Sequence, residues 1–579
     1  MDWPVSTAAA APVRGLEQPA GHLLHSTCCG WRQGRILTRS RAVSLRDFIA
    51  LSPLLIVATG ALVLLLQLAF VRSHRAAFAT FLLTLAAASV DGWIRLPAVE
   101  QATAVTTLLR VDRFSLFFCL LFFFTSAVCG GLGYRYLRAR LTGNRGTSTT
   151  LSSCPSSSSC GEFYFFVLLA TLGACTLVSS QHFASFFLAL ELISLSLYPL
   201  LAFPVPLAKW GAGRDVSNRE AALSLESGIK YLITSALATA LALFGIALMY
   251  AATGNLQFSS MDFSRGESAL LIGGFALLLA GVAFKLSLVP FHVWTADVYE
   301  GAPTPVTAFI ATLGKTALLA ILLRLFSEFS VHILETSVAM ISLLAVASML
   351  GGNLLALRQR NVKRLLAYSA IAHMGYFLVV YLVIDRGIAR EATIYYLVAY
   401  TVTTLCAFSA VSLIDDAALS DVSNPQVTTG DDRNPFQQSF YRGLFWRSPT
   451  LSLCLAAALL SLAGIPFTVG FIGKFYLITA ALDGQLWGLL GALIVGSALG
   501  LFYYLRLLLT LVEAPPIASG QTAGVRVVVD QPHTSAEPAA RNNPLLISRS
   551  GLGLLLLLTA LLLIFGIYPQ MLINGINAL

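Results

Sequence analysis

The chain has 579 residues, of which 57% are hydrophobic and only 11% are charged, and its mean hydropathy is +0.78. An ordinary soluble domain carries about 25% charged residues, so this composition excludes a soluble protein and indicates one that crosses a membrane many times. The formal net charge of +9 does not point to nucleic acid, because short loops beside anionic lipid carry such an excess of basic residues in membrane proteins.

Residues 1–46 differ from the rest of the chain. They are rich in Ala, Ser and Arg, contain few acidic residues and show no sustained apolar periodicity. Arginine-rich, acid-poor N-termini can be transit peptides. We interpret the segment instead as a disordered tail, or as residues that precede a start site assigned too far upstream.

Fourteen apolar runs follow, each long enough to cross a bilayer as a helix. We therefore predict an all-α polytopic membrane protein with about 14 transmembrane helices. The predicted order is three helices (47–134), a Ser-rich cytoplasmic loop (135–161), two groups of five helices (162–326 and 331–512), a polar loop (513–549) and a last helix (550–579). A further polar, turn-rich insertion at 415–448 is also predicted to be a cytoplasmic loop.

An even number of spans places both termini on the same side of the membrane. The loops predicted on the opposite side hold most of the arginines and lysines outside the tail. Because basic loops stay in the cytoplasm, we predict that both termini are periplasmic.

Two of the predicted spans contain a proline within an apolar run, Pro290 in 267–294 and Pro466 in 449–482. Proline breaks a helix, and the freed carbonyl groups need protein or water around them within a bilayer. Each break lies in the fourth span of a five-helix group, and an odd number of spans inverts the second group in the membrane. A matching pair of interrupted helices indicates a transport site; two ordinary proline kinks are the alternative.

Five charged residues lie within apolar runs where charge costs at least ~2.5–3.5 kcal/mol. They are Glu191, Lys230, Lys285, Lys315 and Lys474. A lysine in a poorly hydrated site can change its charge near neutral pH, as a proton relay requires. The alternatives are ion pairs that only hold helices together and, for Lys230 near a span end, a side chain that reaches the interface.

Two histidines, His292 and His373, lie in or near the predicted spans. Histidine titrates near neutral pH and can both donate and accept a proton, so both are candidate relay members. A satisfied core histidine is an equal alternative for each. Asp297 and Glu300 follow His292, and we expect solvated or structural roles for them at a helix end.

The nine cysteines are scattered, without the spacing of a zinc, haem or iron–sulfur site. The chain also contains neither a phosphate-binding glycine loop nor a nucleophile elbow. We therefore expect no metal and no cofactor on this chain.

At the charged and broken segments the sequence resembles the subunit N family of bacterial proton-pumping NADH-quinone oxidoreductase (respiratory complex I), whose members are related to Mrp antiporter subunits. The similarity covers roughly residues 47–575 and is specific at Trp294-Thr-Ala-Asp-Val-Tyr-Glu-Gly-Ala-Pro303. The other matching segments are Glu191-Leu-Ile-Ser-Leu, Ser227-Gly-Ile-Lys230-Tyr, Phe284-Lys285-Leu-Ser-Leu-Val-Pro290-Phe-His292, Lys363 through Tyr376, and Ser461 through Tyr476.

The resemblance implies 14 helices with two inverted five-helix repeats and one proton channel. The channel would use the glutamate of the fifth helix and the lysines of the sixth, seventh, eighth and twelfth, here Glu191, Lys230, Lys285, Lys315 and Lys474. NADH, FMN, iron–sulfur clusters and quinone would belong to partner subunits. The implied partners are a neighbouring antiporter-like subunit and small quinone-side subunits in the bacterial inner membrane. A cation/proton antiporter subunit and a purely structural spacer are the alternatives.

Overall fold

The computed structural model describes residues 45–71, 73–99, 103–142, 159–203, 215–260, 268–328, 335–384, 387–421, 436–513 and 548–579. The predicted tail before residue 45 lies outside these ranges. So do the middle parts of the three predicted polar loops, at 143–158, 422–435 and 514–547.

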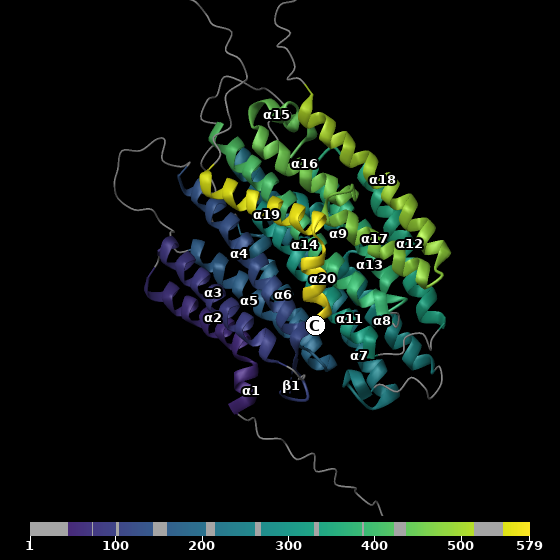
Figure 1. Ribbon diagram of the computed structural model, residues 1–579. Helices are drawn as coiled ribbons and strands as arrows, with labels where there is room; N and C mark the ends of the chain where they lie inside the picture. Colours follow the sequence, from purple (N-terminus) through teal and green to yellow (C-terminus); the bar gives the residue numbers. More distant parts are fainter. Residues whose placement is uncertain are drawn as a thin grey trace, which may run out of the picture. The chain divides into compact units, whose positions relative to one another are not determined.

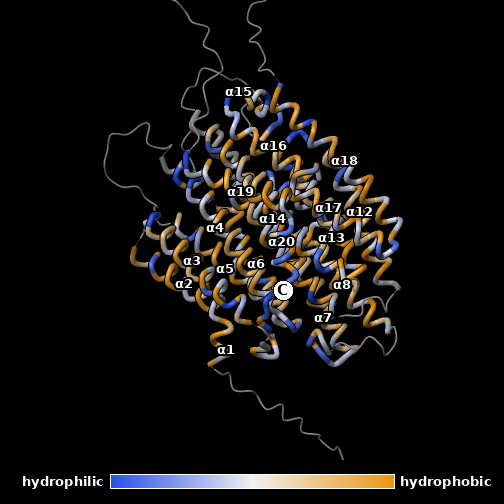
Figure 2. The backbone as a smooth tube through the Cα atoms, in the orientation of Figure 1, coloured by the Kyte–Doolittle hydropathy of each residue, from blue (hydrophilic) through white to orange (hydrophobic). Residues whose placement is uncertain are grey.

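Thirteen helices of the described ranges are long and apolar enough to cross a membrane (Figure 1). Each falls on a predicted apolar run, which confirms an all-α polytopic membrane protein. Most of their length is hydrophobic (Figure 2). They are α2 (Ser52–Phe70), α3 (His74–Ala98), α4 (Arg113–Thr142), α5 (Ser159–Val178), α6 (Phe183–Leu201), α7 (Asp215–Thr253), α8 (Ala269–Leu286), the continuous helix α10 (Thr304–Phe309), η5 (Ile310–Gly314) and α11 (Lys315–Glu328), α12 (Glu335–Leu357), α13 (Val362–Tyr381), α14 (Gly387–Asp421), α18 (Trp487–Val512) and α19 (Arg549–Ile567).

The remaining predicted run, 449–482, is divided into two shorter helices, α16 (Pro449–Ala463) and α17 (Val469–Asp483). The short elements are α1 (Leu45–Ala50), η3 (Phe258–Ser260), α9 (Val293–Gly301), η8 (Gln438–Tyr441), α15 (Leu444–Arg447) and α20 (Gln570–Asn577). Strands β1 (Thr103–Ala104) and β2 (Arg110–Val111) form a two-residue antiparallel ribbon in which Thr103 pairs with Val111. The two inverted five-helix repeats stay a prediction.

The helices differ in how much of their surface the rest of the chain covers. The apolar segment of α14 is 100% buried, that of α10–α11 is 94% buried and that of α13 is 89% buried, whereas only 28% of α2 and of α19 is buried. Helices α14, α10–α11 and α13 therefore form the protein interior. Polar side chains on them are withheld from lipid, where an unsatisfied polar group costs several kcal/mol.

Helices α7 and α8 approach each other through small residues, as is common for helices in membranes. A Cβ atom added at Gly281 would lie 2.6 Å from the carbonyl oxygen of Ala238, and one added at Gly274 would lie 2.8 Å from the carbonyl oxygen of Gly245. This packing fixes α8, and with it the lysine in the last turn of α8.

We expect Gly281→Val to destabilise the α7–α8 pair by about 1–3 kcal/mol or more, because the added atoms meet backbone and cannot be accommodated by a rotamer change. Thermal unfolding of the purified protein measures the effect. Gly273→Val is the matched control, since it lies on the same helix and a Cβ there has no neighbour within 4 Å. An equal loss of stability in both variants would contradict the packing argument.

Candidate functional site

The first predicted helix break is present. Helix α8 ends at Leu286, because Ser287 adopts a left-handed backbone conformation with φ 65°, and α9 begins only at Val293. Pro290 lies in the irregular segment between them. The free helix end is satisfied by Lys315, whose Nζ donates to the Leu286 carbonyl at 3.0 Å and to Ser287 Oγ at 3.1 Å.

Lys315 itself begins α11, directly after the π-helical turn η5. Such widened turns are rare and frequently occur at functional sites. The Tyr400 hydroxyl from α14 donates to the Ala311 carbonyl of this turn at 3.0 Å. The side chain of Lys315 is therefore placed where α8, the π-helical turn and α14 meet, and the residue is only 2% exposed.

The second predicted break repeats the arrangement. Helix α16 ends at Ala463, capped by Gly464 with φ 83°, and α17 begins at Val469. Lys474 Nζ donates to the carbonyls of Leu462 and Ala463, both at 2.9 Å, and the residue is 7% exposed.

Lys315 and Lys474 thus bind the carboxyl ends of two broken helices, where the partial negative charge of the helix dipole favours a cation. Among the described residues, their hydrogen-bond partners are backbone carbonyls and the Ser287 hydroxyl. A partial charge holds an ammonium group less firmly than a carboxylate would. Either lysine can therefore lose its proton without leaving an anion unpaired.

Glu191 and Lys285 form an ion pair. Glu191 Oε1 lies 3.7 Å from Lys285 Nζ, and their side chains are 24% and 11% exposed. Lys285 Nζ also donates to Ser194 Oγ at 2.5 Å and to Ser235 Oγ at 2.7 Å. The serines come from α6 and α7, so three helices surround one ammonium group.

His373 lies between the two breaks. It is 4% exposed, and its Nδ1 lies 2.5 Å from the Tyr396 hydroxyl. Its ring packs against Tyr400, at 5.8 Å between centroids, and against Tyr376, at 5.5 Å. Lys474 Nζ lies 5.5 Å from the centre of the Tyr376 ring.

The contacts link Glu191 to Lys285, and they link Tyr400, His373, Tyr376 and Lys474 in that order. Lys315 is joined to these two groups through the backbone, at Leu286 beside Lys285 and at Ala311 one turn before Lys315. We call the seven side chains together the axial chain: Glu191, Lys285, Lys315, Tyr400, His373, Tyr376 and Lys474. Sequence reasoning missed the two tyrosines. Their signal was weak, because tyrosine in a buried apolar helix is ordinarily a core residue.

His292 is not among the side chains that make up the axial chain. It is the residue before α9, is partly buried, and its Nδ1 has no hydrogen-bond partner among the described residues. Within the described ranges no hydrogen bond or ion pair joins it to a lysine, so its role in a relay stays a prediction.

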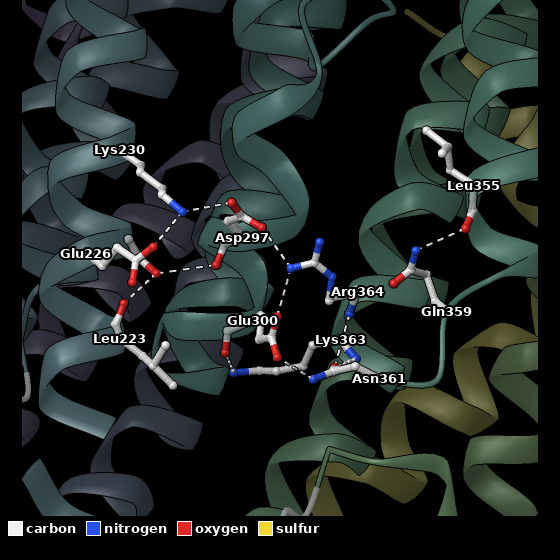
Figure 3. Close-up of polar contacts among 11 residues, drawn as sticks. Leu223, Glu226, Lys230, Asp297, Glu300, Leu355, Gln359, Asn361, Lys363 and Arg364 are labelled. Atoms are coloured by element: carbon white, nitrogen blue, oxygen red, sulfur yellow. Dashed lines mark hydrogen bonds and ion pairs between the residues drawn. The ribbon is translucent and has the colours of Figure 1, made fainter. Parts of the chain in front are cut away.

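Lys230 belongs to a separate network of charges (Figure 3). Its Nζ lies 2.5 Å from a carboxylate oxygen of Glu226 and 2.8 Å from one of Asp297. Arg364 continues the network, at 2.7 Å from Asp297 and 2.8 Å from Glu300. The expected structural role of Asp297 and Glu300 fits this position, because together they tie α7, α9 and α13.

Further hydrogen bonds hold the end of this network. Asn361 donates to Glu300 Oε1 at 2.9 Å, and Lys363 donates to the Glu300 carbonyl at 3.3 Å (Figure 3). Lys363 also donates to the Ala302 carbonyl at 2.7 Å. Sequence reasoning did not include Glu226 and Arg364. Glu226 had a signal, since it lies one helical turn before Lys230; the partnership of Arg364 depends on the tertiary fold.

Comparisons with known proteins agree on one family. Residues 180–500 match the family model described as NADH:quinone oxidoreductase/Mrp antiporter, transmembrane. NADH-quinone oxidoreductase subunit N of Ectopseudomonas mendocina is 40% identical over 540 residues, which cover 92% of this chain and 96% of that protein. A chain of respiratory complex I from Thermus thermophilus is 31% identical with a TM-score of 0.66, covering 91% of this chain and 99% of that one. A chain of the Mrp complex from Dietzia sp. shares the fold, with a TM-score of 0.70 at 21% identity over 92% of this chain and 97% of that one.

Proposed function

Because this chain belongs to the NADH-quinone oxidoreductase subunit N family, we propose that its axial chain carries protons through the membrane arm of that complex. The protein is a proton-translocating membrane subunit of NADH-quinone oxidoreductase. Electron transfer from NADH to quinone takes place in other subunits of the complex. This chain couples that reaction to the movement of protons.

The observation that carries the assignment of residues is the repeated break. In each half of the chain a helix ends inside the bundle, and a buried lysine binds its last carbonyls. Tyr400, His373 and Tyr376 lie between the two lysines in helices that are shielded from lipid. A proton that leaves one lysine therefore has hydroxyl and imidazole groups along its way to the other.

The Glu191–Lys285 pair is proposed to control entry to this line. While Glu191 faces the Lys285 ammonium group, the proton is held by the attraction of the pair. When a change in a neighbouring subunit weakens that attraction, Lys285 can pass a proton towards Lys315, whose partners at Leu286 and Ser287 follow Lys285 directly in sequence. Lys230 is proposed to act with Glu226 and Asp297 at the edge of the relay.

The chain assembles with other subunits of the respiratory complex as a multi-pass membrane protein. We propose that its neighbours are a second antiporter-like subunit and the small quinone-side subunits, and that FMN, iron–sulfur clusters, NADH and quinone are bound by partners. We further propose the bacterial inner membrane as its location, with both termini periplasmic, since most arginines and lysines outside the tail lie in loops predicted on the opposite side.

Purification from membranes tests this function. We expect affinity-tagged chain to co-purify with NADH:quinone oxidoreductase activity, and the reconstituted complex to acidify vesicles when NADH is added. The alternative is a cation/proton antiporter subunit, which the fold shared with the Mrp complex permits. Isolation of the chain without NADH-dependent activity, together with sodium-driven proton exchange, would overturn the proposal.

A further inference from the structure

A polar seam runs along the buried helix α14 towards the end of the bundle that carries the network of Figure 3. Tyr400, Thr404, Ser412 and Asp415 are separated by four, eight and three residues, so they lie on one side of the helix. Asp415 is only 3% exposed, and one of its carboxylate oxygens accepts a hydrogen bond from Thr304 Oγ1 at 3.2 Å. An apolar helix could pack in the protein interior without these four polar groups.

The Tyr400 hydroxyl donates to the Ala311 carbonyl, but the other two hydroxyl groups of the seam are unsatisfied among the described residues. Thr404 Oγ1 and Ser412 Oγ are buried without a hydrogen-bond partner among the described residues, and so is the Tyr299 hydroxyl, whose ring contacts Phe408 on the same side of α14. An unsatisfied buried hydroxyl costs about 1–3 kcal/mol, and native proteins usually satisfy such groups with water. A small cavity lined by Tyr400, Thr404 and Phe408 has room for about one water molecule.

The opposite wall of the seam leads to the axial chain. Thr304, Thr307, Ala311 and Lys315 are spaced three, four and four residues apart along α10, η5 and α11, again on one side. Thr304 contacts Asp415 at one end of this wall, and the Ala311 carbonyl accepts from Tyr400 near the other. The seam therefore has a carboxylate at its outer end and the Lys315 amine at its inner end.

We propose that this seam is a proton entry branch, with Asp415 as the residue that receives protons from the side of the membrane predicted to carry the basic loops, and Lys315 as the residue that accepts them. The proposal rests on the function proposed above. Asp415 takes a proton from a hydronium ion, which leaves as water, so that one O–H bond forms as another breaks. Each hydroxyl or water of the seam then accepts a proton on one side and gives one up on the other. The last transfer forms an N–H bond on a neutral Lys315, and no electron is exchanged.

The test measures protons pumped per NADH oxidised by the assembled complex in vesicles. We expect Asp415→Asn to lower this ratio to the value given by Lys315→Met, and Asp415→Glu to restore most of it. Asp416→Asn is the matched control: the next carboxylate on α14 turns away from the seam and pairs with Arg135 at 3.4 Å. We expect its ratio to equal that of the unaltered complex.

A second variant covers the case in which Asp415→Asn fails to assemble. Ser412→Ala removes a buried seam hydroxyl that has no hydrogen-bond partner among the described residues, and it should lower the ratio. An unchanged ratio in Asp415→Asn or Ser412→Ala, or equal losses in Asp415→Asn and Asp415→Glu, would overturn the entry branch. If the complex that carries Lys315→Met pumps normally, that result would contradict the proposed role of the axial chain instead.

Discussion

Lys315→Met will reduce NADH-driven proton pumping by at least about 100-fold through this chain, while the protein still folds and assembles. Methionine approximates the length of lysine and fills the same space, but it carries no proton. Positioned proton-transfer groups contribute about 10²–10⁴-fold to rate, and Lys315 is the group at which α8, the π-helical turn and α14 meet. The initial rate of vesicle acidification, with the contribution of other pumping subunits subtracted, measures the effect.

Lys363→Met is the matched control for Lys315→Met. Lys363 is also buried, at 1% exposed, and it also donates to backbone carbonyls, those of Glu300 and Ala302. It lies in the network of Figure 3 and outside the axial chain. We expect this variant to lose stability and to retain pumping. Equal pumping by both methionine variants would show that Lys315 serves only to close a helix end.

Glu191→Gln will both destabilise the protein and lower proton pumping, because Lys285 then lacks the carboxylate that holds its proton until release. The substitution leaves the Lys285 ammonium group buried beside two serines, and removal of one partner from a buried pair costs about 3–5 kcal/mol. Because the Glu191 side chain is 24% exposed, we expect the lower end of that range. Thermal unfolding and vesicle acidification measure the two effects separately.

The double variant Glu191→Gln/Lys285→Gln distinguishes a relay from a structural ion pair. Without either charge the burial penalty disappears, so we expect stability to return towards that of the unaltered protein. Proton transfer should not return, because neither group can then carry a proton. A double variant that is stable and pumps normally would show that the pair only holds α6 and α8 together.

Much of this arrangement could be predicted from the sequence because its signals are local. Pro290 and Pro466 mark the two breaks, and the structure places irregular segments there, after Ser287 and Gly464 with positive φ. The charged residues were found because each interrupts an apolar run. Hydropathy alone, however, joined α16 and α17 into one run, since the four residues between Gly464 and Val469 include Ile465 and Phe467.

The contacts that give the site its order could not be predicted in this way. Tyr376 and Tyr400 look like core residues until the fold places them between His373 and the two lysines. The pairing of Lys230 with Asp297, 67 residues away in the chain, depends on how α7 packs against α9. Periodicity identifies the buried side of a helix, but it does not identify the neighbouring helix.

Non-additivity between distant variants tests the central claim most directly. Glu191 and Lys474 lie at opposite ends of the axial chain. If they served two independent proton routes, variants at both would lower pumping additively. If they serve one route, the second variant would add no further loss. The measurement is the number of protons pumped per NADH oxidised by complexes that carry Glu191→Gln, Lys474→Met, or both. A single axial chain predicts the same reduced ratio in all three complexes; a ratio that falls further in the double variant would contradict it.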